Sequence, residues 1–151
     1  MIRRAGTART GAVSARGISS SLDVMPRVLV VADAQWTLSS VRSALSAPGY
    51  ELSEETDPRL VSGRVSSESP DVAVVDLQVG SMGGMAIIRQ LKDDASIAGS
   101  AHVPVVLLLD RSADAFLAKR AGAEAWVQKP FTAFELRRAV ESTITVEAES
   151  E

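Results

Sequence analysis

Short apolar runs alternate with amphipathic stretches along most of this 151-residue chain. Three of the runs are continuously apolar, as expected for parallel strands that are buried on both faces of a sheet. The pattern predicts five strands, at Arg27–Ala32, Tyr50–Glu54, Val72–Asp76, Val103–Leu109 and Glu124–Gln128.

A stretch with helical spacing of its apolar residues follows each predicted strand. The last of these stretches opens with a capping box, Thr132-Ala133-Phe134-Glu135, and continues through Leu136, Ala139 and Val140. The other four predicted helices are Gln35–Ala47, Asp57–Glu68, Met85–Lys92 and Ser112–Ala121. Five β-α units in about 120 residues indicate an α/β fold, a doubly wound parallel sheet with helices on both faces.

The two ends of the chain differ from this body. Residues 1–25 are rich in Ser, Gly, Ala and Arg and show no periodicity, which is typical of a disordered leader. An over-long start, with Met25 as the true first residue, or an organelle transit peptide gives the same composition. We expect one folded domain over residues 26–146 and an acidic tail over residues 147–151.

Composition excludes several kinds of site. The chain has no cysteine and only one histidine, His102, which excludes thiolate sites, His-cluster metal sites and Ser-His-Asp triads. After residue 25 the chain holds 12 basic and 18 acidic residues, a balance that argues against nucleic-acid binding. No apolar stretch approaches the roughly 20 residues of a membrane span.

Asp76 ends one predicted strand, Asp33 and Lys129 each directly follow another, and a glycine-rich loop follows Asp76. The carboxyl ends of parallel strands meet at one edge of the sheet, where open α/β sheets bind ligands. We therefore expect Asp33, Asp76 and Lys129 to share one crevice. Two carboxylates and an ammonium suit a small divalent metal and a phosphoryl group.

The chain from Arg27 to about Thr145 resembles the receiver domain of two-component response regulators, the CheY-like family. The resemblance implies a flavodoxin-like (βα)5 fold with strand order 2-1-3-4-5. It depends on four segments and their spacing: VLVVAD (28–33), PDVAVVDL (70–77), PVVLLLD (104–110) and GAEAWVQKPF (122–131).

By this resemblance Asp76 is the phosphoacceptor and Lys129 contacts the acyl phosphate. The cofactor implied is Mg²⁺, with Asp33, Asp76 and the backbone carbonyl of Gln78 as its ligands. The implied phosphoryl donor is a histidine kinase, a phosphotransfer protein or a small acyl phosphate. The resemblance further implies a cytoplasmic signalling protein that is not an enzyme.

The chain departs from the family pattern at several site positions. Ala32 replaces one carboxylate of the acidic pair, which should lower the affinity for metal. Leu109 stands where the family has a Thr or Ser hydroxyl, and a lost hydrogen bond to a charged group typically costs ~1.5–3 kcal/mol. Asp110 would disfavour phosphate further if it faced the crevice. Trp126 takes the place of the switch aromatic, either as a partial core residue or as an exposed anchor for a partner.

Two functions follow from these features. The first is a single-domain response regulator that is phosphorylated on Asp76 and acts through the face of the fourth helix, fifth strand and fifth helix. The second is a pseudo-receiver that serves as a constitutive adaptor without phosphorylation, which Ala32 and Leu109 favour. An enzyme is disfavoured, because a dinucleotide-binding G-x-G-x-x-G is missing after the first strand. We expect Trp36, next to the crevice, to pack rather than to bind a ligand.

Overall fold

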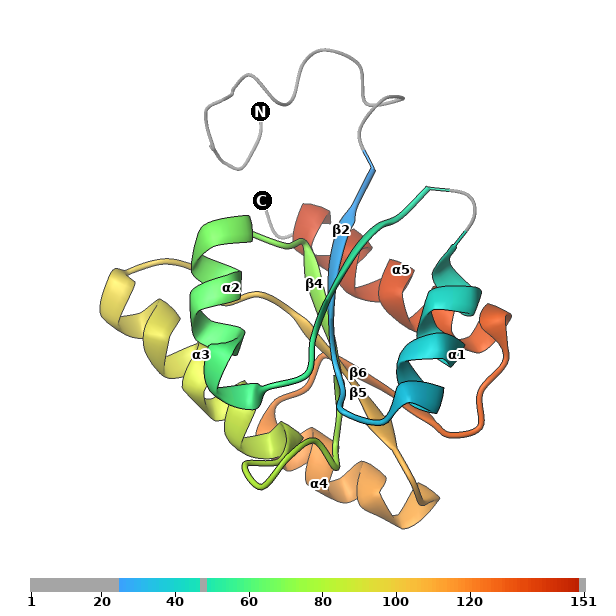
Figure 1. Ribbon diagram of the computed structural model, residues 1–151. Helices are drawn as coiled ribbons and strands as arrows, with labels where there is room; N and C mark the ends of the chain where they lie inside the picture. Colours follow the sequence, from blue (N-terminus) through green and yellow to red (C-terminus); the bar gives the residue numbers. More distant parts are fainter. Residues whose placement is uncertain (1–24, 47–48, 150–151) are drawn as a thin grey trace.

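Five parallel strands form the sheet at the centre of the fold (Figure 1). The computed structural model describes residues 25–46 and 49–149. The sheet has the order β3-β2-β4-β5-β6, which in chain order is 2-1-3-4-5, so the predicted topology is confirmed. Its strands are β2 (Arg27–Val31), β3 (Glu51–Glu55), β4 (Val72–Asp76), β5 (Val105–Leu109) and β6 (Ala125–Gln128).

Helices cover both faces of this sheet (Figure 1). α1 (Gln35–Leu45) and α5 (Ala133–Glu149) lie on one face. α2 (Val61–Glu68), α3 (Gly84–Ala98) and α4 (Ala115–Ala121) lie on the other. The predicted doubly wound architecture is therefore confirmed.

Each face has its own apolar core, because successive side chains of a strand point to opposite sides. On β5, Val106 and Leu108 join the core under α1 and α5. Val105, Leu107 and Leu109 join the core under α2, α3 and α4. All residues of β4 and β5 are buried, which explains why these two runs are continuously apolar in the sequence.

The bounds of several helices differ from the predicted ones. α2 and α4 are each preceded by a short 3-10 helix, Pro58–Leu60 and Ser112–Asp114. α3 extends six residues beyond the predicted end at Lys92, to Ala98. α5 continues to Glu149 and so takes in the first part of the predicted acidic tail. The predicted leader up to residue 24 lies outside the described residues. None of the described helices is long and apolar enough to span a membrane.

Candidate functional site

The charged residues at the strand ends meet at the carboxyl edge of the sheet. Parallel pairing aligns Val31 of β2 with Val75 of β4, so Asp33 and Asp76 follow neighbouring strands at the same edge. Lys129 follows β6, and its amide donates to the carbonyl of Leu109 at 2.7 Å. Its ammonium Nζ lies 2.9 Å from Oδ1 of Asp76. The structure thus brings together the Asp76–Lys129 pair that the strand-end pattern predicts.

Asp76 is held in one orientation and is only 2% exposed. Its Oδ1 accepts hydrogen bonds from Nζ of Lys129 at 2.9 Å and from the amide of Gln78 at 3.1 Å. Within the described part of the chain, Oδ2 of Asp76 has no hydrogen-bond partner. One oxygen is therefore anchored and the other is available to a ligand.

Lys129 has a second carboxylate partner. Its Nζ lies 3.0 Å from Oδ1 of Asp110 and 5.2 Å from the centroid of the Trp36 indole. Burial alone would lower the pKa of Lys129, because it disfavours the charged form. The hydrogen bonds to Asp76 and Asp110 outweigh this effect, so the pKa lies above its ordinary value and the side chain stays an ammonium.

Backbone amides of the loop after β4 donate to the carboxylates of both Asp33 and Asp76. The amide of Gly80 donates to Oδ2 of Asp33 at 2.8 Å, and Gly80 has a φ of 54°. At Gly84, which opens α3, an added Cβ would lie 2.8 Å from the carbonyl oxygen of Asp76. Only glycine allows so close an approach of α3 to the end of β4.

The oxygen donors fit Mg²⁺ in kind. Mg²⁺ prefers carboxylate oxygens and keeps several waters, so one or two carboxylates and a phosphate are enough to bind it. Oδ1 of Asp33 and Oδ2 of Asp76 have no hydrogen-bond partner among the described residues. Over the same residues, no group of three Asp, Glu, His or Cys side chains is placed to hold a metal ion. In this part of the chain, Asp33 and Asp76 are therefore the two carboxylates that a metal ion at this edge could use.

The two apolar replacements belong to the cores beneath the site. Ala32 is fully buried under α1 and α5, whereas Leu109 is 1% exposed under α2, α3 and α4. Leu109 offers no donor, so the β5 side of the site supplies packing instead of a hydroxyl. The charged residue at this side is the next one, Asp110.

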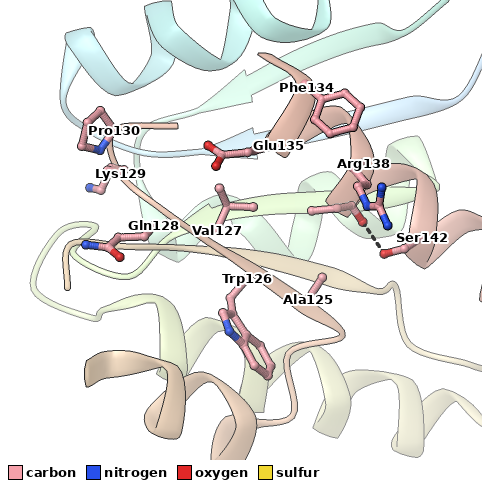
Figure 2. A pocket seen from close by; sticks show the side chains of 11 residues that line it. Ala125, Trp126, Val127, Gln128, Lys129, Pro130, Phe134, Glu135, Arg138 and Ser142 are labelled. Atoms are coloured by element: carbon pink, nitrogen blue, oxygen red, sulfur yellow. Dashed lines mark hydrogen bonds between the residues drawn. The ribbon is translucent and has the colours of Figure 1, made fainter. Parts of the chain in front are cut away.

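The two tryptophans differ in exposure and in their neighbours. Trp36, which was expected to pack rather than to bind a ligand, is 58% exposed and faces the Lys129 ammonium with its ring, so it lies outside the core. The sequence feature that could have predicted this placement is that Trp36 lies three residues after Asp33. Trp126 is 37% exposed and borders a groove of about 680 Å³ between β6 and α5. In Figure 2 its indole points away from Phe134 and Arg138.

Comparison with known sequences identifies the family of this chain. Residues 28–141 match the response regulator receiver domain. The chain is 32% identical over 122 residues to the transcriptional regulatory protein PrrA of Mycobacterium leprae, covering 80% of this chain and 48% of that protein. It is 30% identical over 112 residues to the response regulator MprA of Mycolicibacterium vanbaalenii, covering 73% of this chain and 46% of MprA. The chain thus spans about half the length of these relatives.

Solved structures share the fold. The chemotaxis response regulator CheY4 of Vibrio cholerae matches with a TM-score of 0.69 at 22% identity, over 80% of this chain and 99% of CheY4. A response regulator receiver domain from Clostridium thermocellum matches with a TM-score of 0.73 at 24% identity, over 84% of this chain and all of that one. The sheet order, the residues at the strand ends and the match over residues 28–141 agree, and the chain belongs to the response regulator receiver domain family of two-component signalling.

Proposed function

We propose that the chain accepts a phosphoryl group on Asp76 in a Mg²⁺-dependent reaction and signals through protein contacts. The observation that carries this proposal is the state of the Asp76 carboxylate. One oxygen is fixed by Lys129 and by the Gln78 amide, and the other has no hydrogen-bond partner among the described residues. Aspartyl phosphate and Mg²⁺ are standard for receiver domains.

Transfer needs a donor with a reactive phosphoryl group, namely a histidine kinase, a phosphotransfer protein or a small acyl phosphate. A carboxylate oxygen of Asp76 forms a bond to phosphorus while the bond from phosphorus to the donor atom breaks. The bonding electron pair leaves with the donor, a histidine nitrogen or an acyl carboxylate. The Lys129 ammonium offsets the negative charge at Asp76 throughout and keeps its proton.

Bound Mg²⁺ would neutralise charge on the attacking carboxylate and on the phosphoryl oxygens. Asp33, Asp76 and the backbone carbonyl of Gln78 would hold the ion. The Gly80 amide keeps Asp33 on the loop that follows Asp76. This arrangement orients both carboxylates without the second acid that Ala32 replaces.

The output surface that we propose is the α4-β6-α5 face, defined here by its exposed residues Phe116, Lys119, Trp126 and Phe134. Exposed aromatic side chains are favoured as anchors in protein interfaces. Here Phe116 and Phe134 each lie beneath an arginine, Arg120 and Arg138, at 5.6 and 5.9 Å from the ring centroids. A partner protein would bind over these rings and the groove beside Trp126 (Figure 2).

Acetyl phosphate with Mg²⁺ tests the proposal directly. We expect the intact protein to gain the mass of one phosphoryl group, on the peptide that contains Asp76. Asp76→Asn should gain none, because the amide is a poor nucleophile of nearly the same shape. Asp94→Asn, an exposed acid on α3, is the matched control and should be labelled like the wild type. Absence of label in the wild type, or equal labelling of Asp76→Asn, would instead favour the constitutive adaptor.

A further inference from the structure

Lys129 is shared between two carboxylates of unequal exposure. Its ammonium lies 2.9 Å from Asp76, which is buried, and 3.0 Å from Asp110, whose side chain is 42% exposed. Both oxygens contact the same nitrogen, so they lie within two hydrogen-bond lengths of each other. Asp110 is therefore beside the place where a phosphoryl group on Asp76 would sit.

The backbone places Asp110 there. Leu109, the last residue of β5, accepts a hydrogen bond from the amide of Lys129 at 2.7 Å, and Asp110 is the next residue. The guanidinium of Arg111 pairs with Asp114 at 2.9 Å and interacts with Asp110 only by Coulombic attraction. Among the described residues, Lys129 is the only cation that forms an ion pair with Asp110.

We propose that Asp110 is a positioning residue that competes with the phosphoryl group for Lys129 and limits phosphorylation of Asp76. The proposal rests on Asp76 being the phosphoacceptor. In the unphosphorylated protein Asp110 helps to neutralise and hold the ammonium. When the phosphoryl group arrives, Lys129 must turn one of its donors from Asp110 to a phosphoryl oxygen.

Two effects of Asp110 then act in the same direction. The carboxylate keeps part of the Lys129 charge away from the phosphoryl oxygens. It also repels the added negative charge across a short distance in a partly buried site, where screening is weak. The site offers no compensating hydroxyl on this side, because the preceding residue is Leu109. The net charge around the phosphoryl group is therefore less favourable than Asp33, Asp76 and Lys129 alone would make it.

Asp110→Asn removes the charge and keeps the shape of the side chain. We expect its rate of phosphorylation by acetyl phosphate, with Mg²⁺, to exceed the wild-type rate by about tenfold, an effect in the range of one screened charge pair. Asp94→Asn is the control for the change in net charge. It lies near the far end of α3, roughly 15 Å along the helix axis from Gly84, and should leave the rate unchanged.

A second measurement needs neither metal nor phosphate. An acetylating reagent modifies a lysine faster when the amine is less restrained, and peptide mass spectrometry gives the rate for Lys129 alone. We expect faster modification of Lys129 in Asp110→Asn than in Asp94→Asn. A merely structural role of Asp110 would slow phosphorylation of the variant through misplacement of Lys129.

The outcomes separate this proposal from the proposed function. An unchanged or slower phosphorylation rate in Asp110→Asn, while the wild type is labelled on Asp76, overturns the role of Asp110 and leaves the proposed function intact. Labelling of Asp110→Asn with no labelling of the wild type supports the role of Asp110 most strongly. If neither protein is labelled, both the phosphoacceptor role of Asp76 and the competition by Asp110 are wrong.

Discussion

At the scale of single residues, Leu109 belongs to the apolar core and gives the neighbouring site no hydrogen-bond donor. It is 1% exposed and packs with the apolar residues under α2, α3 and α4. By the family resemblance, a hydroxyl at this position would donate to a phosphoryl oxygen, which Leu cannot do. Stability and phosphate binding therefore make opposite demands on the side chain here.

We expect Leu109→Thr to change stability and ligand affinity in opposite directions. Loss of buried apolar volume should lower the free energy of unfolding by about 2–4 kcal/mol. A hydroxyl hydrogen bond to a charged group should raise the affinity for beryllofluoride, a phosphoryl mimic, about tenfold. Urea unfolding measures the first quantity, and a fluorescence titration with beryllofluoride and Mg²⁺ measures the second.

Leu107→Thr is the matched control for this prediction. Leu107 lies on the same face of β5, two residues earlier, and is fully buried. The control should lose similar stability and gain no affinity. An equal gain in both variants would mean that loosening of the core, and not the hydroxyl, improves binding.

The strand-end pattern was enough to predict the meeting of Asp76 and Lys129, because both lie at the carboxyl ends of strands in one parallel sheet. It was not enough for Asp110 or Trp36. Each lies in a segment that leaves the sheet, and the direction of such a side chain depends on the local backbone. From the sequence, Asp110 was expected to disfavour phosphate only if its side chain faced the crevice. The ion pair with Lys129 at 3.0 Å shows that it does.

At the scale of elements, α2 is attached to the sheet largely by polar contacts. Val61 is the only buried residue of this helix. Arg64 donates from Nη1 to Oε1 of Glu55 at 2.8 Å and pairs through Nε with Glu68 one turn on. Glu68 also accepts from the hydroxyl of Ser53 in β3 at 2.8 Å. A network of side chains thus adds to the apolar contact that Val61 and Val65 make with the core.

This network predicts a contribution of Glu68 to the acid sensitivity of stability. Hydrogen bonds from Arg64 and then from Ser53 hold the pKa of Glu68 below its ordinary value of 4.5. The stabilisation is present above pH 4.5 and is lost as the pH falls through the lower pKa of the folded state. Since both side chains are partly exposed, we expect it to be within about 1 kcal/mol.

Urea unfolding between neutral and acid pH measures the effect. Glu68→Gln should be less stable than the wild type near neutral pH and should approach it in acid. Asp93→Asn, an exposed acid on α3, should keep the wild-type dependence. A constant difference between Glu68→Gln and the wild type at all pH values would contradict the assigned role of the ion pair.

The end of α3 was not predicted correctly by the periodicity of its apolar residues. The prediction depended on Ile87, Ile88 and Leu91 and ended at Lys92, yet the helix continues to Ala98. It ends at Gly99, which has a φ of 72° and donates to carbonyls of the last turn. A C-terminal glycine of this kind is a stop signal in its own right. A helix end on the protein surface is thus better predicted from its capping residue than from its apolar pattern.

At the scale of the whole molecule, capture of a phosphoryl group and its relay to the α4-β6-α5 face are separable. Under the proposed function, capture depends on Asp33, Asp76 and Lys129 at the edge of the sheet. Relay, by the family resemblance, depends on a hydroxyl at position 109 that moves the aromatic ring on β6. Here Leu109 is fixed in the core, while Trp126 is already 37% exposed. Movement at the site therefore has no hydroxyl link to Trp126.

We expect beryllofluoride with Mg²⁺ to change the fluorescence of Trp36 much more than that of Trp126. Trp36 lies 5.2 Å from the Lys129 ammonium, which must move when a phosphoryl mimic binds. The chain has two tryptophans, so Trp126→Phe isolates the signal of Trp36 and Trp36→Phe isolates that of Trp126. Asp76→Asn in each background is the control and should abolish both responses. An equal response from Trp126 would show that relay across β6 needs no hydroxyl, and that the packing of Leu109 itself transmits the change.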